Sequence, residues 1–120
     1  TGRAKDLIKT AGANVAPREV EAVLDGFPET LLSVVVGLTD PDRGEVVGAV
    51  VVPMSGSAVD PTDIVTRVNR ELSSYKVPRR LLVLDESEVP YLPTGKPDRQ
   101  ALTALLEADG LPVTPDRGNP

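Results

Sequence analysis

Two uninterrupted aliphatic runs near the middle of the chain most constrain what it can fold into. Residues 31–38 and 46–52 are rich in Val and Leu, and a polar segment with a Pro and a Gly separates them. Aliphatic runs of this length without polar alternation are typical of strands that are buried on both faces. The pattern therefore predicts two interior strands joined by a turn.

Three amphipathic segments predict helices that can pack on these strands. Pro17, Pro61 and Pro97 stand at the starts of the segments, where the missing N–H of proline costs a helix nothing. Each segment repeats apolar residues at helical spacing, which predicts one buried face per helix. These residues are Val20, Val23 and Leu24 in the first segment, Ile64, Val65, Val68 and Leu72 in the second, and Leu102, Leu105 and Leu106 in the third.

The remaining elements complete a small sheet in a chain whose 120 residues fit one domain. Residues 2–15 suit two short strands around a turn, and residues 81–84 suit another buried strand. This order predicts an α/β or α+β fold: a small mixed sheet flanked by about three helices, with an N-terminal β-hairpin. We expect residues 110–120, with three Pro and two Gly, to form a disordered tail.

The composition excludes several kinds of chemistry. The chain has no Cys and no His, which excludes thiol nucleophiles, disulfides, thiolate or imidazole metal sites and Ser-His-Asp triads. We therefore expect no metal site. Any chemistry must be carried by Lys, Arg, Asp, Glu or the backbone.

Charge and hydropathy limit the partners. The 18 acidic and 13 basic residues give a net charge of −5, which disfavours binding to a nucleic-acid backbone. No apolar run approaches the roughly 20 residues that span a bilayer. The chain also opens on charged residues rather than on a signal peptide. We expect a cytoplasmic protein with no membrane span and no nucleic-acid partner.

Three polar clusters could carry chemistry. Arg3, Lys5 and Lys9 share one face of a predicted strand, which suits a phosphate or an adenylate, although periodicity alone favours a solvated strand face. Residues 75–80 form a basic patch, which indicates either a site for an anionic ligand or cations that stabilise the C-terminal end of a helix. Residues 91–96 form a loop whose Lys is either a solvated turn residue or a cation presented to a phosphate. This loop lacks the first Gly of a Walker A motif.

Three motifs, taken in order, resemble one known family. They are Gly-Arg-x-Lys-Asp from residue 2, Pro-x-Glu-x-Glu from residue 17, and Pro-Thr-Gly-Lys-x-x-Arg from residue 93. With this order and spacing, residues 2 to about 106 resemble the C-terminal domain of adenylate-forming enzymes. That superfamily includes acyl- and aryl-CoA synthetases, firefly luciferase and the adenylation domains of nonribosomal peptide synthetases. The resemblance implies the fold of this mobile domain.

The resemblance also implies a two-step ligase reaction. A carboxylic acid and ATP form an acyl-adenylate and pyrophosphate, and a thiol, usually that of coenzyme A, then displaces AMP. The implied partners are a missing N-terminal domain, a small carboxylic acid, coenzyme A, and ATP with Mg²⁺ bound mainly by the missing domain. Residues 1–5 would form the hinge and residues 6–109 the domain. Alone, this chain should be inactive.

The resemblance assigns residues to the adenylation step and to the hinge. Lys96 matches the catalytic Lys that enters the active site for adenylation. Arg3 matches a nucleotide-contacting Arg, and Lys9 matches a Lys near the acyl-adenylate. Lys5 falls at the hinge position between the two domains.

The resemblance assigns other residues to coenzyme A. Ala11 and Gly12 match positions that line the tunnel for the pantetheine arm, where a larger side chain would obstruct the thiol. Tyr75, Lys76 and Arg79 lie where family members contact the nucleotide end of coenzyme A. The phosphates at that end would account for the basic patch.

Two alternatives keep the same fold. One is an adenylation domain that loads a carrier protein, and the other is a non-catalytic binding or regulatory module. A Lys at the hinge position is commoner among acyl-CoA synthetases and luciferases, and no carrier-protein domain follows in the chain. The preferred interpretation is therefore a ligase that uses free coenzyme A.

Overall fold

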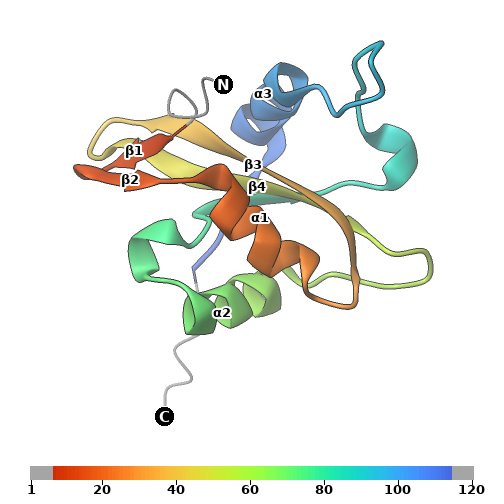
Figure 1. Cartoon of the computed structure of the whole chain (residues 1–120), viewed down its shortest axis with the longest axis horizontal. Helices are drawn as coiled ribbons and strands as arrows, with labels where there is room; N and C mark the ends of the chain where they lie inside the picture. The colour runs from red at the N-terminus through yellow and green to blue at the C-terminus, as the bar shows by residue number, and fades with distance from the viewer. Residues whose placement is uncertain (1–6, 115–120) are drawn as a thin grey trace.

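A six-stranded mixed sheet with helices on both faces forms the fold (Figure 1). The computed structural model describes residues 7–114. The elements are β1 (Ile8–Thr10), β2 (Ala13–Val15), α1 (Pro17–Asp25), β3 (Thr30–Asp40), β4 (Gly44–Pro53), α2 (Pro61–Glu71), η2 (Ser74–Lys76), β5 (Arg80–Val83), η3 (Glu86–Glu88), α3 (Arg99–Asp109) and β6 (Leu111–Pro112). This architecture confirms the predicted fold class.

Strand β4 lies at the centre of the sheet. One edge of β4 pairs antiparallel with β3, and the other edge pairs parallel with β5 and, at Gly44, antiparallel with Thr10 of β1. The predicted pairing of the two aliphatic runs is confirmed. The prediction that both are interior strands is wrong for β3, because among the described residues only β4 pairs with it. Hydropathy reports the burial of the two faces of a strand and says nothing about its edges.

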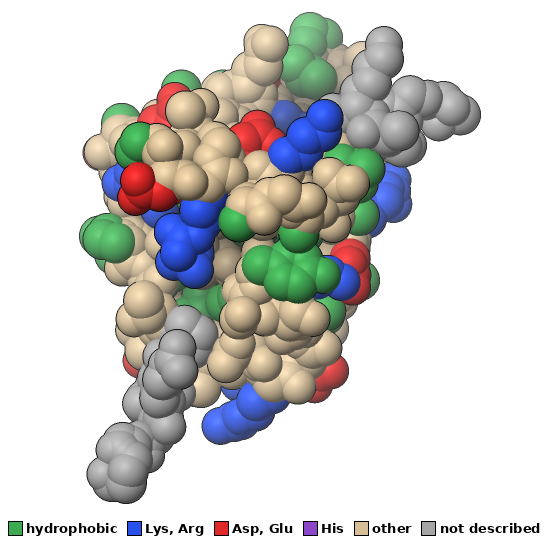
Figure 2. Space-filling model, turned by 90° about the vertical axis from the view of Figure 1, so that its left-hand side faces the viewer, with side chains coloured by type: hydrophobic (Ala, Val, Ile, Leu, Met, Phe, Trp, Pro, Cys, Tyr) green, Lys and Arg blue, Asp and Glu red, His purple; other side chains and the backbone are tan. Residues whose placement is uncertain are grey.

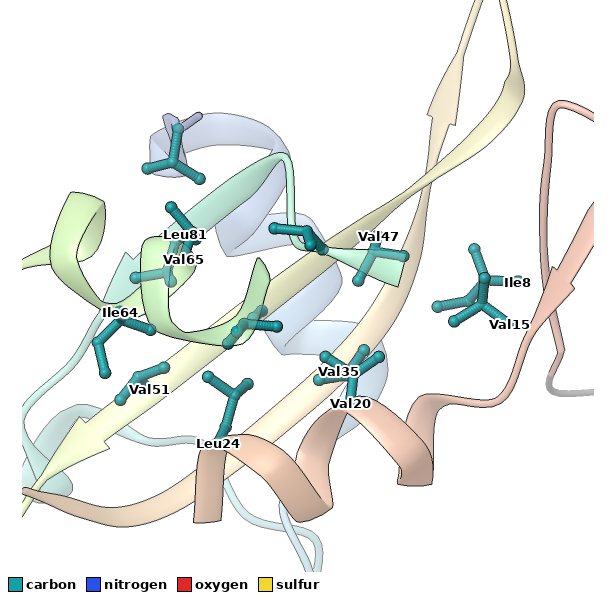
Figure 3. Close-up of a cluster of buried hydrophobic side chains, with 14 residues drawn as sticks. Ile8, Val15, Val20, Leu24, Val35, Val47, Val51, Ile64, Val65 and Leu81 are labelled. Carbon is teal, nitrogen blue, oxygen red and sulfur yellow. The ribbon is translucent and has the colours of Figure 1, made fainter. Parts of the chain in front are cut away.

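Apolar side chains cover both faces of β4. Successive side chains of a strand point to opposite faces. Val47 and Val51 join the cluster packed against α1 and α2, which is drawn in Figure 3. Val50 and Val52 join a second cluster, packed against α3. Burial on both faces explains why this strand carries almost no polar residue.

The start of α3 lies two residues later than the sequence predicts. The helix begins at Arg99 rather than at Pro97, because the Asp98 carboxylate caps it by accepting a hydrogen bond from the Ala101 N–H at 3.1 Å. Pro97 instead pairs with Tyr91 in an isolated bridge. The predicted starts of α1 and α2 are confirmed. The position of this cap decides where the polar loop before α3 ends.

The segment after α3 differs from the expected disordered tail. Strand β6 pairs antiparallel with β5, and the Val113 N–H donates to the Arg79 carbonyl at 2.9 Å. Val113 is buried in the apolar cluster that packs against α1 and α2. The prediction of disorder is therefore wrong for residues 110–114, because the open edge of β5 offers backbone partners that a Pro and Gly count does not report. Residues 115–120 lie outside the described residues.

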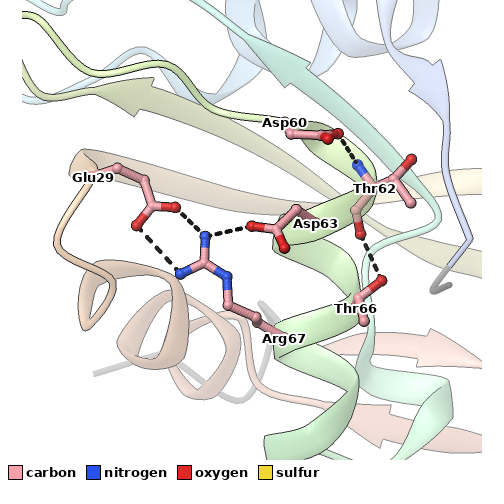
Figure 4. A network of polar contacts seen from close by, with 6 residues as sticks. All are labelled: Glu29, Asp60, Thr62, Asp63, Thr66 and Arg67. Carbon is pink, nitrogen blue, oxygen red and sulfur yellow. Dashed lines mark hydrogen bonds and ion pairs between the residues drawn. The ribbon is translucent and has the colours of Figure 1, made fainter. Parts of the chain in front are cut away.

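A polar network joins α2 to the segment that follows α1 (Figure 4). The Arg67 guanidinium pairs with the Glu29 carboxylate and, at 3.0 Å, with Asp63. It also lies over the Phe27 ring, 4.4 Å from the ring centre. The hydrogen bond with Arg67 lowers the pKa of Glu29 below its ordinary value of 4.5, and the same bond raises the pKa of Arg67. The network therefore favours the charged forms of both groups in the folded state.

Glu29→Gln is expected to reduce the stability of this chain most at neutral pH. Because the pKa of Glu29 is lowered by folding, the network adds stability above about pH 4.5, and this stability is lost as the pH falls through the lowered pKa. The variant should lose about 1 kcal/mol at neutral pH and should show a shallower loss of stability in acid. Urea unfolding between pH 3 and 7 measures both effects. Glu71→Gln, at the exposed end of α2, is the control and should behave like the parent.

Candidate functional site

The structure places the predicted site residues in two groups at opposite ends of the sheet. The tip of the β1–β2 hairpin and η2 lie at the left of Figure 1, and the loop that carries Lys96 lies at the upper right. Arg3 and Lys5 lie outside the described residues. The chain therefore presents two separate polar regions rather than one composite site.

The loop that carries Lys96 is a closed hairpin. The Gly95 N–H donates to the Leu92 carbonyl, and the Leu92 N–H donates to the Lys96 carbonyl, both at 2.8 Å. The bridge between Tyr91 and Pro97 closes the hairpin below these bonds. Backbone hydrogen bonds thus hold Lys96 at a set place in the loop.

The residue types in this loop explain its geometry. Pro93 is the second residue of the turn, where the proline ring fixes φ at a value that the turn requires. Gly95 has a φ of 89°, a left-handed conformation that L side chains disfavour. A tight turn followed by a left-handed Gly is a common way to close a short hairpin. The Pro-Thr-Gly sequence is therefore a structural requirement for presenting Lys96.

Lys96 is exposed, and within residues 7–114 no carboxylate forms a salt bridge with its ammonium group. By contrast, Arg67, Lys76 and Arg99 each pair with a carboxylate. A cation without an internal partner can attract an external anion without first losing an ion pair. Both interpretations of this loop, a solvated turn residue and a cation presented to a ligand, are compatible with an exposed and unpaired Lys96.

The tip of the β1–β2 hairpin has an unusual backbone. Ala11 and Gly12 have φ values of 51° and 85°, as a two-residue type I′ turn requires. The Ala11 N–H donates to the Arg43 carbonyl at 2.9 Å, which fastens the tip to the β3–β4 turn. No atom lies within 4 Å of a Cβ built on Gly12. The tip therefore presents little side-chain bulk to its surroundings.

Lys9 lies on the exposed side of the same hairpin. Its backbone N–H donates to the Glu45 carboxylate at 2.9 Å. This bond ties β1 to β4 beyond the single backbone pairing of Thr10 with Gly44. Sequence reasoning missed Glu45, and no local signal marks it, because its partner lies 36 residues away.

The basic patch in residues 75–80 is only partly available to a ligand. Lys76 forms an ion pair with Glu19 of α1 at 2.8 Å, and the hydrogen bond to Glu19 raises the pKa of Lys76. The Tyr75 side chain is 42% exposed, and Arg79 is also exposed. Figure 2 faces this end of the molecule and shows basic side chains at several separate places rather than in one block. Tyr75 and Arg79 are the open members of the patch.

Two further residues of the sequence motifs meet in the structure. Glu21 of α1 and Arg99 of α3 both bond to the backbone of Val35 on β3. Sequence reasoning recognised their motifs but gave neither residue a role. The signal that could have identified Arg99 is its basic charge at the start of a helix, where the helix dipole disfavours a cation.

The described part of the chain contains neither a cluster of metal-binding side chains nor a membrane-spanning helix. No three His, Cys, Asp or Glu side chains within residues 7–114 gather so as to hold a metal ion. In the same range, no helix is long and apolar enough to cross a bilayer.

Comparison with known families shows which family this domain belongs to. The sequence profile of the AMP-binding enzyme C-terminal domain matches residues 19–96, a stretch that begins in α1 and ends at Lys96. The chain belongs to the AMP-binding enzyme C-terminal domain family. This finding confirms the resemblance seen in the three motifs, two of which lie at least partly within the matched stretch.

Relatives of this AMP-binding C-terminal domain are much longer proteins. It is 40% identical over 97 residues to a medium/long-chain-fatty-acid–CoA/3-oxocholest-4-en-26-oate–CoA ligase of Mycolicibacterium smegmatis, covering 81% of this chain and 17% of the relative. It is 43% identical over 100 residues to the fatty acid–acyl-carrier-protein ligase ScoC of Streptomyces coeruleorubidus, covering 83% and 19%. A Mycobacterium tuberculosis fatty acyl CoA synthetase structure matches with a TM-score of 0.76 and 33% identity, covering 92% and 21%. The chain thus spans about a fifth of each relative.

Ala11→Gly is expected to stabilise the chain by about 1 kcal/mol, because glycine removes the cost of holding a Cβ at positive φ. Urea unfolding of the parent and the variant measures the difference. Ala13→Gly is the matched control: Ala13 lies in β2, and a strand glycine should instead lower stability by about 0.5–1 kcal/mol. Equal effects of the two substitutions would contradict the type I′ assignment.

Proposed function

We propose that this chain is the C-terminal domain of an AMP-forming acid–thiol ligase that converts a carboxylic acid, ATP and coenzyme A into acyl-CoA, AMP and pyrophosphate. The observation that carries the proposal is the presentation of Lys96 without an internal carboxylate partner, at the end of the stretch that matches the family. Relatives named as fatty acid–CoA ligases support the reaction class. Medium- and long-chain fatty acids are therefore the first acids to test.

In the first step Lys96 acts as an electrostatic catalyst. A carboxylate oxygen attacks the α-phosphorus of ATP, and the bond from that phosphorus to the bridging oxygen of pyrophosphate breaks. Negative charge builds up on the oxygens around the α-phosphorus, and an ammonium group close to them lowers the barrier without transferring a proton. The hydrogen-bonded loop supports this role because it fixes the backbone from which the Lys96 side chain extends.

In the second step the opposite end of the sheet acts. The thiol sulfur attacks the carbonyl carbon of the acyl-adenylate, and AMP leaves. The small residues Ala11 and Gly12 would leave room for the pantetheine arm, and Tyr75 and Arg79 would contact the nucleotide end of coenzyme A. Lys9 would lie near the adenylate. The separation of the two ends (Figure 1) supports a domain that offers one end at a time to the missing N-terminal domain.

The hinge and the metal belong to parts that the described residues do not contain. Arg3 and Lys5, the proposed nucleotide contact and hinge, lie outside residues 7–114. Within that range no cluster of acidic side chains fits Mg²⁺. No step is therefore routed through the metal, and no ligand for it is assigned among residues 7–114.

A carrier protein is the second candidate for the thiol donor. The relative ScoC, at 43% identity, is named as a ligase to an acyl-carrier protein. Both donors present the same phosphopantetheine arm, so the hairpin tip suits either. Assay of the full-length enzyme with free coenzyme A separates them, because a carrier-specific enzyme should form almost no acyl-CoA.

Lys96→Ala in the full-length enzyme is expected to slow adenylation by about 100-fold, because one preorganised charge contact at the reacting phosphate is lost. Pyrophosphate release measures this step. The thioester step, started from synthetic acyl-adenylate and coenzyme A, should change little. Arg70→Ala, on an exposed face of α2, serves as the control and should leave both steps unchanged. A variant at Lys96 that slows both steps equally would contradict the proposed role.

Residues 1–120 alone are expected to be inactive, because adenylation needs groups from the rest of the enzyme. Incubation with ATP, Mg²⁺ and a panel of carboxylic acids should release no pyrophosphate above background. Release that depends on both the acid and this chain would show that the domain is a complete enzyme, and would overturn the proposal.

A further inference from the structure

The geometry points to Arg99 as a positioning residue that holds the Lys96 loop in the place that adenylation needs. It does so by bonding the start of α3 to the outer edge of β3, a contact with Glu21 and Val35 that we call the clamp. This inference rests on the proposed function of Lys96. In this role Arg99 acts through the placement of the loop rather than by contact with substrate.

The clamp consists of three groups with complementary hydrogen bonds. The Val35 N–H donates to the Glu21 carboxylate at 2.8 Å. The Arg99 guanidinium donates to the Val35 carbonyl, and its other nitrogen lies 3.4 Å from the same Glu21 oxygen. Both polar groups of the Val35 backbone are thus satisfied, and the two charges that satisfy them also pair with each other. Charge-assisted bonds of this kind are stronger and more directional than neutral ones.

The clamp closes an edge that the sheet leaves open. Strand β3 pairs only with β4 among the described residues, so the Val35 N–H and carbonyl point away from the sheet. Glu21 comes from α1 on one face of the sheet, and Arg99 comes from α3 on the other. The edge of β3 therefore joins both helical layers at one backbone position.

The placement of Arg99 is unfavourable unless it serves this contact. Arg99 is the first residue of α3, where the positive end of the helix dipole repels a cation. A residue that conflicts with local preference commonly marks a requirement set elsewhere in the structure. Leu102 and Leu106 of α3 make apolar contacts with the sheet, and at the far end of the helix Arg80 of β5 donates to the carbonyl of the C-cap Gly110 at 2.9 Å. Apolar burial is non-directional, so the clamp and the bond from the Asp98 N–H to the Pro90 carbonyl are the directional contacts that set the orientation of the first turn.

The start of α3 is directly coupled to Lys96. Only two residues separate Lys96 from Arg99. The Asp98 N–H donates to the Pro90 carbonyl at 2.9 Å, so the two ends of the loop are fastened together at its base. A shift of the first turn of α3 therefore moves the loop as a unit and displaces the ammonium group.

The test measures both half-reactions of the full-length enzyme. Arg99→Met should lower the kcat of adenylation by about 10- to 100-fold, as misplacement of a catalytic group by about 1 Å does. The KM for ATP and the thioester step from synthetic acyl-adenylate should change little. Arg99→Lys should restore part of the rate, because a Lys can donate to the Val35 carbonyl but lacks the planar fork that reaches both acceptors. Arg70→Met is the matched control and should leave both steps unchanged.

A double-mutant cycle separates positioning from general stability. If Arg99 acts only through Lys96, Arg99→Met should add almost no further loss in the Lys96→Ala background, because interacting residues are non-additive. Additive losses, or an equal loss in both half-reactions, would overturn the inference. Glu21→Gln, which weakens the same clamp from α1, provides a second measurement if Arg99→Met does not fold, and it should produce the same selective loss.

The outcomes also distinguish failure of this inference from failure of the proposed function. If Lys96→Ala leaves adenylation unchanged, the proposed role of Lys96 fails and the positioning role fails with it. If Lys96→Ala lowers adenylation selectively but Arg99→Met and Glu21→Gln do not, the proposed function stands and only the positioning role is overturned.

Discussion

The burial of β4 on both faces is the constraint on which the rest of the structure depends. Its valines alternate between the cluster shared with α1 and α2 and the cluster shared with α3, so neither face can be left to water. Its two edges carry β3 on one side and β1 and β5 on the other. Because every layer is built on this strand, the hairpin tip and the Lys96 loop are held at opposite ends of one sheet.

The cations of the chain differ in whether the fold already neutralises them. Arg67, Lys76 and Arg99 each have a carboxylate partner, whereas Lys96 and Arg79 have none among residues 7–114. A net charge of −5 repels an anionic ligand at long range. In the proposed function, the attraction of phosphates would therefore depend on local cations that the fold leaves unpaired. Arg67, Lys76 and Arg99 each join two segments of the fold through their carboxylate partners, whereas Lys96 and Arg79 remain exposed.

Features that rest on neighbouring residues could be predicted, and those that rest on distant partners could not. The two buried strands, the start of α1 at Pro17 and the hairpin tip at Gly12 follow from local patterns. The clamp of Glu21 and Arg99 could not be predicted as a pair, because 78 residues separate its members and they meet only at the edge of β3. The order in residues 110–114 was missed for the same reason: it depends on the open edge of β5.

By itself the sequence determined which segments are buried, where the helices α1 and α2 begin, and that a cation stands in a loop shaped by Pro and Gly. Hydropathy, proline and glycine act within a few residues, so their effects can be read along the chain. Only the tertiary structure decided that β3 lies at an edge, that Lys76 is paired while Lys96 is not, and that Arg99 anchors α3. These outcomes depend on which strands become neighbours and which helix covers which face, and no single segment carries the identity of its partner.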